Sequence, residues 1–208
     1  MRQGPPSGRP FAISAPKARS GPIVLYFAAR KSICCGMEQS LSLRRARPSD
    51  LAAVDLLLSR SYPRLLAADY PPSTLVTALP LISRARPDLL SSRSYFVVED
   101  AEGRIVGAGG WTAHSPAARG VKVQAGLGHI RHVATEPSMT RQGIGTALMG
   151  QVIADALSQG VRWLDCLSTR TAVPFYRALG FRVVNPVDIS LAPGIDFPVI
   201  RMMRQIRP

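Results

Sequence analysis

The hydrophobic pattern changes near residue 40, and from there it predicts a strand followed by two helices. Residues 41–46 alternate between apolar and polar side chains, as in a half-buried strand. Residues 51–60 then place apolar side chains three or four positions apart, which predicts one buried helical face: Leu51, Val54, Leu57 and Leu58. Ser49 or Asp50 is placed to cap this helix, and a serine after a proline pair is placed to cap a second helix over residues 73–84.

The middle of the chain predicts three more strands. Residues 94–99 are rich in β-branched and aromatic side chains, and an Asp-Ala-Glu-Gly turn at residues 100–103 leads into a returning strand over residues 104–111. A loop rich in glycine, alanine and serine occupies residues 113–127, and residues 129–136 form the next strand, which a proline stops. These segments predict the larger part of one sheet.

A glycine-containing loop over residues 138–148 leads into the longest remaining helix, which Gly160 ends. The inner face of that helix is predicted to consist of Ile144, Leu148, Val152 and Ala156. The last predicted elements are a strand over 161–168, a short helix over 172–179 and two strands over 181–184 and 199–203. The order of strands and helices predicts one α/β domain with a central sheet.

The N-terminal 36 residues differ from the rest of the 208-residue chain. They contain basic but no acidic residues, and most of them are Arg, Gly, Pro, Ser and Ala without periodicity. We expect residues 1–36 to be a disordered or non-native extension, with a transit peptide as the alternative, and residues 37–208 to be the folded domain. No apolar stretch approaches the roughly 18 residues of a membrane helix, so we expect no membrane partner.

Cysteine content and charge narrow the choice of function further. The chain has three cysteines and no CxxC pair, which predicts no metal site and a reducing, cytoplasmic location. The net charge of +13 comes mostly from arginines that are spread along the chain rather than clustered. Such a distribution favours weak attraction to polyanions, so we predict no specific nucleic-acid partner.

The loop at residues 141–146 is the strongest candidate for chemistry. Backbone N–H groups at the start of a helix carry partial positive charge, and glycines allow a phosphate to approach them closely. A dinucleotide-binding loop requires glycine where Leu148 stands, and a Walker loop requires Gly-Lys-Ser/Thr. Taken alone, the loop is equally typical of a helix start in which the glycines serve packing.

Residues 129–184 resemble the GNAT superfamily of N-acetyltransferases. The resemblance rests on a strand, a proline, the Gly143-Ile144-Gly145 loop six residues later, an amphipathic helix, another strand, and then Phe-Tyr-x-x-x-Gly-Phe from Phe175. It implies a mixed, mostly antiparallel sheet of about seven strands with about four helices, in which strands 129–136 and 161–168 are splayed. It also implies acetyl transfer from acetyl-CoA, without a metal, to a primary amine of a small molecule or a protein. Homodimers are common in such folds and are kept as an expectation.

The resemblance also implies roles for individual residues. Tyr176 is the general acid that protonates the leaving CoA thiolate. The residues that hold acetyl-CoA are Val133, Ala134 and Thr135 on the strand, Arg141, Gln142, Gly143, Ile144, Gly145 and Thr146 in the loop, and Ser168 and Thr171 beyond the next strand. The loop departs from the family at Thr140, where Arg or Gln is usual, and Thr171 stands where Asn is common.

The general base is the least defined role. Arg131 stands where some family members have a glutamate base, so His132 is the candidate, because the ordinary pKa of histidine, about 6.5, suits the task. Strand alternation places His132 on the face opposite Arg131, where a space-filling role is the alternative. A set of residues near the acceptor is also expected: Asp69, Tyr70, Tyr95 and Trp111. The missing glutamate leaves a second function open, a non-catalytic acyl-CoA-binding or sensor domain.

Overall fold

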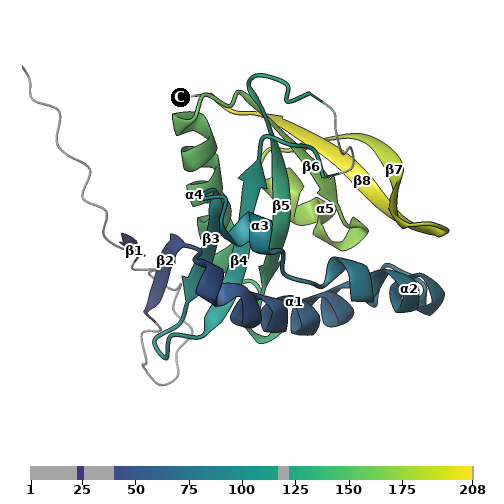
Figure 1. Cartoon of the computed structure of the whole chain (residues 1–208), viewed down its shortest axis with the longest axis horizontal. Helices are drawn as coiled ribbons and strands as arrows, with labels where there is room; N and C mark the ends of the chain where they lie inside the picture. The colour runs from purple at the N-terminus through teal and green to yellow at the C-terminus, as the bar shows by residue number, and fades with distance from the viewer. Residues whose placement is uncertain (1–22, 26–39, 117–121, 208) are drawn as a thin grey trace, which may run out of the picture.

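The computed structural model describes residues 23–25, 40–116 and 122–207, which form one sheet with helices on both faces (Figure 1). The strands are β1 (Ile23–Leu25), β2 (Leu41–Arg45), β3 (Tyr95–Glu99), β4 (Ile105–Thr112), β5 (Leu127–Thr135), β6 (Trp163–Ser168), β7 (Arg182–Ala192) and β8 (Ile195–Gln205). The helices are α1 (Leu51–Leu66), α2 (Pro72–Ile82), α3 (Pro87–Leu90), α4 (Ile144–Ser158) and α5 (Val173–Ala178). This order confirms the predicted α/β fold. No helix of the described residues is long and apolar enough to span a bilayer.

The sheet has eight strands in the order β1-β2-β3-β4-β5-β6-β8-β7. All neighbouring strands are antiparallel except β5 and β6, which are parallel. Strands β2 to β8 are the seven predicted strands, so the mixed, mostly antiparallel sheet is confirmed. Strand β1 lies within the predicted extension, residues 1–36, and pairs Ile23 with Leu43. The rest of that extension lies outside the described residues.

The two parallel strands separate soon after they meet. Only three residues of β5, Leu127 to His129, pair with β6. The following residues of β5 continue along β4 as far as Thr135, whereas β6 continues along β8 as far as Ser168. This confirms the predicted splay, and it leaves one backbone edge of β5 without a strand partner next to the start of α4.

Alternation along β3 shows which helices cover which face of the sheet. Phe96 and Val98 lie in the core cluster that contains the inner face of α4, whereas Tyr95 and Val97 lie in the cluster that contains Val54 of α1. The predicted inner residues of α4 are all buried: Ile144, Leu148, Val152 and Ala156. The helices α4 and α5 therefore cover one face, and α1 and α3 cover the other.

Helix boundaries differ from the prediction where packing overrides local signals. Helix α1 continues past residue 60 to Leu66 although Pro63 lies inside it, because Leu66 packs against α2 and β8 in a third core cluster. Asp50 precedes α1 but makes no side-chain cap; its carboxylate accepts the Arg47 N–H at 2.7 Å and pairs with Arg44. Helix α2 begins at Pro72 and not at the predicted serine, since a proline fits the first turn.

The hairpin of β7 and β8 is much longer than predicted. Each strand has 11 residues, where short strands over 181–184 and 199–203 were expected. Pro186 and Pro198 hide the strand pattern in the sequence. Both prolines are tolerated because β7 is an edge strand and because β8 pairs with β6 only from Ile200 onward, so each proline nitrogen is able to face an unpaired edge.

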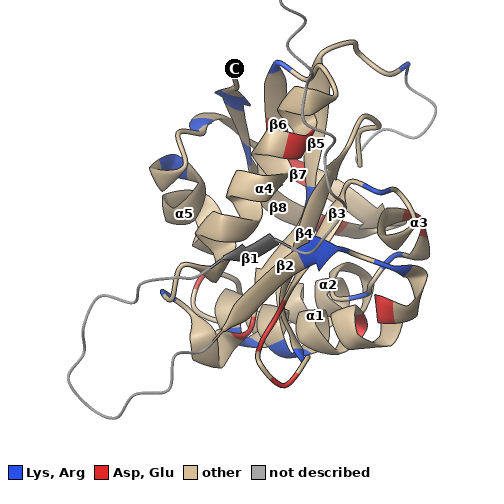
Figure 2. Ribbon diagram, turned by 90° about the vertical axis from the view of Figure 1, so that its left-hand side faces the viewer, with Lys and Arg blue, Asp and Glu red and all other residues tan. Residues whose placement is uncertain are grey.

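Charged residues are spread over the molecule. Figure 2 shows lysines and arginines on several elements, interspersed with acidic residues, rather than gathered into one stripe. Several arginines are paired: Arg44 contacts both Asp50 and Glu99, and Arg104 contacts Asp100. In the view shown, the positive charge follows no single groove or helix.

Gly110 on β4 is expected to be the glycine whose replacement costs the most stability. A Cβ atom there would lie 2.7 Å from the Tyr95 Cα and closer still to the Ser94 backbone oxygen, and backbone atoms cannot rotate away. We expect Gly110→Ala to lower the free energy of unfolding by about 3 kcal/mol. Urea denaturation of the full chain measures this.

The matched control is Gly150→Ala on α4. Gly150 is exposed, and a Cβ atom added there would have no neighbour within 4 Å, so alanine should raise the free energy of unfolding by about 0.5–1 kcal/mol. If Gly110→Ala unfolded at the wild-type urea concentration, the close approach of β3 and β4 would be wrong.

Candidate active site at the diverging strands

The glycine loop takes up a backbone shape that exposes the start of α4. Arg141 and Gly143 both adopt left-handed conformations, with φ of 66° and 83°. Gly143 is the N-cap of α4, its carbonyl accepts the Ala147 N–H at 3.0 Å, and no side chain caps the helix. The N–H groups of the first turn are therefore free of helical partners and point outward, as an anion-binding site requires.

The side chains of the loop divide into two groups. Arg141, Gln142 and Thr146 are exposed, whereas Ile144 is buried in the core against Gly107 of β4. Gly145 has a packing reason to be glycine, because a Cβ there would lie 3.2 Å from the Phe175 ring of α5. Of the predicted loop residues, Ile144 and Gly145 thus offer backbone groups only, while the exposed side chains remain available to a ligand.

Strand β5 is distorted where β6 leaves it. Ala108 pairs with Ala134 but Gly110 pairs with Arg131, so β5 has an extra residue here, and His132 has a φ of 44°. Such a bulge interrupts the alternation of side chains. Ile130 and Val133 accordingly pack in the same core cluster, three positions apart. The expectation that strict alternation separates His132 from Arg131 is therefore wrong.

The unpaired edge of β5 offers backbone groups beside the loop. Glu136 donates its N–H to the Val106 carbonyl of β4 at 2.8 Å, so the residues two apart from it, including Ala134, also direct their backbone groups to β4. Thr135 and Val133 direct theirs the other way, and the Thr135 carbonyl accepts a hydrogen bond from Ser61 of α1 at 3.0 Å. Among the three predicted residues, Val133 and Thr135 face the opening.

Tyr176 lies on α5 on the other side of the divergence. It is buried, it packs edge-to-face against Phe175 and Phe181, and its hydroxyl is hydrogen-bonded to the Cys166 thiol of β6. Burial, reinforced by Cys166, raises the pKa of Tyr176 well above its usual range. The hydroxyl therefore keeps its proton at neutral pH, as a general acid must.

Two further tyrosines approach from the opposite face. Tyr62 of α1 is electrostatically coupled to Cys166, Tyr176 and Tyr95, and burial raises its pKa above the usual range. Tyr95 of β3 donates its hydroxyl to the His132 carbonyl at 3.2 Å. The sequence indicated Tyr95 as an acceptor-side residue, but Tyr62 had no signal, because it falls beyond the predicted end of its helix.

Other predicted residues have structural partners. Ser168 is buried and donates its hydroxyl to the Thr169 carbonyl, and Thr171 donates to the Asp69 carboxylate at 2.6 Å. Tyr70 stacks on Phe197, accepts the Arg170 N–H and donates to the Pro198 carbonyl. Its hydroxyl is fully used in joining the α1–α2 connection to β8 and to the segment before α5.

Trp111 serves the core rather than an acceptor site. Its indole N–H donates to the Asp155 carboxylate of α4 at 2.9 Å, on the face that α4 covers. Asp155 also accepts from Arg45 and Gln159. The expectation that Trp111 lies near the acceptor side is not supported by these contacts.

Arg131 and His132 are neighbours at the bulge, where Arg131 carries a positive charge and His132 is neutral at neutral pH. Arg131 is 7% exposed, and its guanidinium donates to the Thr112 hydroxyl at 3.0 Å. Burial, together with the charge of Arg131, lowers the pKa of His132 to about 4. The His132 Nδ1 atom is buried without a hydrogen-bond partner among the described residues. With its pKa this low, His132 is a weak base and takes up a proton from an amine poorly at neutral pH.

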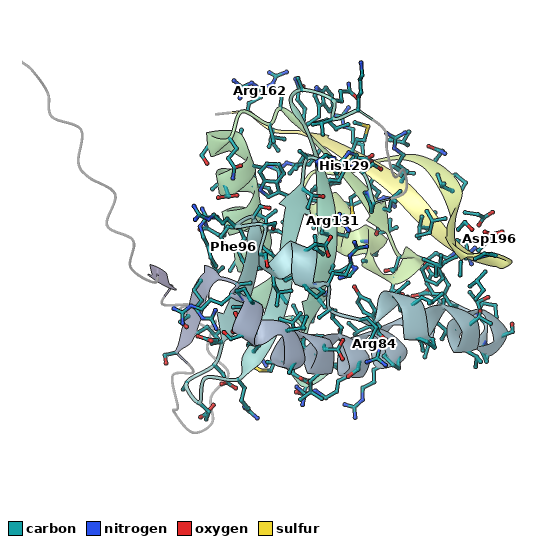
Figure 3. All side chains as sticks on the ribbon, viewed as in Figure 1. Arg84, Phe96, His129, Arg131, Arg162 and Asp196 are labelled. Atoms are coloured by element: carbon teal, nitrogen blue, oxygen red, sulfur yellow. The ribbon has the colours of Figure 1, made fainter. Side chains whose placement is uncertain are left out.

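A second histidine, which the sequence did not single out, has a partner suited to proton transfer. The Nδ1 atom of His129 lies 3.5 Å from Asp165 on β6, the residue with which it pairs across the parallel strands. Arg201 of β8 holds the same carboxylate through two nitrogens at 3.1 and 3.2 Å. Although burial favours protonation, these contacts keep the pKa of Asp165 below its usual value. Figure 3 shows His129 and Arg131 along β5.

A metal site and a groove between α1 and α2 are weaker candidates for a functional site. Within the described ranges, no group of three His, Cys, Asp or Glu side chains is placed to hold a metal ion. A shallow groove of about 540 Å³ lies between α1 and α2, lined by residues that include Leu75, Val76 and Pro80. Its charged residues, Asp55 and Arg84, are paired with each other at 3.2 Å. The diverging strands therefore remain the better candidate.

Comparison with known proteins supports the same interpretation. Residues 91–183 match the family model of the acetyltransferase (GNAT) domain. The chain is 34% identical over 80 residues to a glucosamine 6-phosphate N-acetyltransferase of Trypanosoma brucei brucei, which is 38% of this chain and 52% of that protein. The chain thus matches about half the length of that relative.

Solved structures show the same fold at low sequence identity. A PaiA N-acetyltransferase from Thermoplasma acidophilum, solved in complex with coenzyme A, has a TM-score of 0.59 at 16% identity over 80% of this chain and 99% of its own. A GCN5-related N-acetyltransferase from Rhodopseudomonas palustris has a TM-score of 0.61 at 18% identity over 83% of this chain and 100% of its own. Residues 91–183 are thus similar to the acetyltransferase (GNAT) domain, and the chain shares the fold of these solved structures.

Proposed function

We propose that the protein transfers an acetyl group from acetyl-CoA to a primary amine by direct attack of the amine on the thioester. The observation that carries this proposal is the divergence of β5 and β6 directly beside the uncapped start of α4. An open strand edge suits an amide-containing chain, and a helix start suits a phosphate. Acetyl-CoA carries both groups on one molecule, which few other common substrates do.

Different groups of the chain bind different parts of acetyl-CoA. The N–H groups of Ile144, Gly145 and Thr146 hold the pyrophosphate, with Arg141 and Gln142 beside it. Val133 and Thr135 present backbone groups to the pantetheine amides. Gly143 shapes the turn, and Ser168 and Thr171 border the site from the end of β6. The site requires no metal.

Tyr176 completes the departure of the leaving group. When the amine nitrogen bonds to the carbonyl carbon, the carbon–sulfur bond breaks and the sulfur takes the proton of the Tyr176 hydroxyl. Burial keeps that proton in place until a thiolate develops, because it raises the pKa of Tyr176. Until then the hydroxyl is hydrogen-bonded to Cys166.

The amine proton goes to His129 in this mechanism. Its pairing with the Asp165 carboxylate at 3.5 Å orients the ring and stabilises the imidazolium that forms. Arg201 and the backbone pairing of His129 with Asp165 fix the carboxylate in turn. His132, the base expected from the sequence, remains the second candidate, and its lowered pKa argues for a different role.

The acceptor is a primary amine on a small molecule or on a protein. Glucosamine 6-phosphate belongs among the candidates because a partial relative is named for acetylating it. The proposal includes a cytoplasmic location, which the cysteine content favours, and a homodimer, which is common in folds of this kind. It includes no specific nucleic-acid or membrane partner.

The direct test measures release of CoA thiol by the full chain from acetyl-CoA in the presence of a panel of amines. The panel contains glucosamine 6-phosphate and glucosamine, phosphoethanolamine and ethanolamine, β-alanine and β-alaninamide, spermidine and a lysine peptide. Transfer well above the rate in solvent supports the enzyme. Tight CoA binding with no transfer to any amine favours the alternative, a sensor domain with the same fold.

The loop itself is tested by Thr146→Asp. Aspartate in the first turn suits the helix but repels a pyrophosphate, so the KM for acetyl-CoA should rise roughly 30-fold, about 2 kcal/mol, with no loss of thermal stability. Thr146→Asn, which has the same shape without the charge, is the control and should resemble the wild type. An unchanged KM in Thr146→Asp would place the pyrophosphate elsewhere.

A further inference from the structure

We propose that Arg131 binds a carboxylate or phosphate group of the acceptor, so that the substrate is a short amine with an anionic group. This inference rests on the function proposed above and names the substrate class of the same site. Arg131 is then a specificity-determining residue that contacts the acceptor.

The surroundings of Arg131 make it a buried cation without a counter-charge. The residue is 7% exposed, and its hydrogen bond is to the neutral hydroxyl of Thr112. Within the described part of the chain, no carboxylate lies close enough to its guanidinium to form an ion pair. Burial lowers the pKa of Arg131, with a further contribution from the positive charge of Arg86. A protein retains a buried unpaired cation at a cost to stability.

The neighbouring carboxylates are already committed to other partners. Asp88 of α3, which attracts Arg131 weakly, is held by Arg86 through two hydrogen bonds of 3.0 and 2.9 Å. Asp165 is held by Arg201 and lies against His129. Neither carboxylate can neutralise Arg131 without giving up its own pair, so the missing negative charge must come from a bound molecule.

His132 gives an independent sign that a polar ligand belongs here. Its Nδ1 atom is buried and has no hydrogen-bond partner among the described residues. The charges of Arg86 and Asp88 act on both Arg131 and His132, which places these two side chains near the same segment before and within α3. In the tautomer that carries the ring proton on Nδ1, this atom is a hydrogen-bond donor, and an anion bound at Arg131 would offer it an acceptor.

The position of Arg131 limits the length of the acceptor. Before the bulge, alternation places Arg131 on the same face of β5 as His129, the proposed base. Arg131 is two residues from Val133, where β5 faces the thioester site, and two residues span at most roughly 7 Å even when fully extended. An amine attacked at one point and held through its anion at the other must therefore be short, as in an amino acid or an amino alcohol phosphate.

The experiment uses the full chain, saturating acetyl-CoA and the matched pairs of the amine panel, such as phosphoethanolamine with ethanolamine. The wild type should prefer the anionic member of at least one pair through a KM lower by roughly 10- to 100-fold, the range for a hydrogen bond to a charged group. Arg131→Gln should abolish that preference, while Arg131→Lys, which keeps the charge, should retain part of it. The KM for acetyl-CoA should not change.

Arg162→Gln is the control, because it removes an equal charge from an exposed position (Figure 3). Thermal unfolding separates a ligand-binding role from a structural one. Removing an unpaired buried cation should leave the melting temperature of Arg131→Gln equal to or above that of the wild type. A lower melting temperature together with an intact preference for anionic amines would show a structural role and overturn the proposal.

Failure of the inference and failure of the proposed function give different results. Equal use of neutral and anionic amines by the wild type leaves the acetyltransferase intact and overturns the anion site. If no amine is acetylated by a protein that binds CoA, calorimetry of phosphoethanolamine and β-alanine on the CoA-saturated protein measures the contact without chemistry. Binding lost in Arg131→Gln supports the anion site, and absent or unchanged binding overturns it.

Discussion

Replacement of Tyr176 by phenylalanine is expected to lower kcat by roughly 100- to 10,000-fold while leaving the affinity for acetyl-CoA unchanged. The phenyl ring keeps the edge-to-face packing against Phe175 and Phe181, so the change removes one hydroxyl from a buried position. Because the variant lacks the hydroxyl proton of Tyr176, CoA must leave as an unprotonated thiolate in a low-dielectric site. Steady-state turnover and calorimetric titration of the variant separate the two effects.

The pH profile and the leaving group provide the internal controls. Because burial raises the pKa of Tyr176, the hydroxyl stays protonated as the pH rises, and the wild type should show no loss of kcat from this group below about pH 10. An acyl donor with a more acidic thiol should recover much of the lost rate in Tyr176→Phe. A variant with wild-type kcat across the pH range would show that another group, or water, protonates the sulfur.

Replacement of His129 by glutamine is expected to lower kcat/KM at neutral pH by roughly 100- to 10,000-fold, the contribution of a positioned general base. The defect should shrink as the pH rises, because more of the amine then reaches the site already deprotonated. Asp165→Asn should produce a smaller defect of the same kind, since it removes the carboxylate that orients the ring at 3.5 Å. The measurement is the pH dependence of kcat/KM for the wild type, His129→Gln and Asp165→Asn.

The matched control for this prediction is His132→Gln, which changes the neighbouring histidine in the same way. Burial and Arg131 lower the pKa of His132 to about 4, so its loss should leave the pH profile unchanged. If His132→Gln instead produced the larger defect with rescue at high pH, the base expected from the sequence would be correct, and His129 would serve only to hold Asp165.

Periodicity predicted the elements whose burial is regular along the chain. The inner face of α4 falls where the spacing of apolar residues places it, because this helix buries one stripe. Strands β3 and β4 are buried on both faces, and they were predicted instead from their residue types and the turn between them. The splay of β5 and β6 was predictable only from the family resemblance. No sequence pattern within β5 or β6 predicts that the two strands separate after His129.

Features that depend on contacts between distant segments could not be predicted. The bulge at His132 arises from the register of β5 against β4, and strict alternation therefore misplaced this side chain. The pairing of His129 with Asp165 joins residues on two parallel strands, 36 positions apart in sequence, counted from 129 to 165. The length of the hairpin of β7 and β8 was hidden because Pro186 and Pro198 resemble strand breakers unless edge positions are known.

The packing of Gly145 changes how the loop should be tested. A bulky side chain there would displace Phe175 as well as obstruct a ligand, so lost binding in such a variant would have two causes. Thr146 is exposed and lies one residue further along the same turn, where a change of charge acts on the ligand alone. The loop is therefore best tested by changes at Thr146.

The most direct test of the acetyl-CoA site is a calorimetric titration of the full chain with acetyl-CoA. The open edge of β5 and the uncapped start of α4 predict saturable binding at one site in the micromolar range, competed by CoA and weakened in Thr146→Asp but not in Thr146→Asn. Absence of binding by a protein that unfolds cooperatively would show that the glycine loop serves only to start a helix, and that the fold is present without its activity.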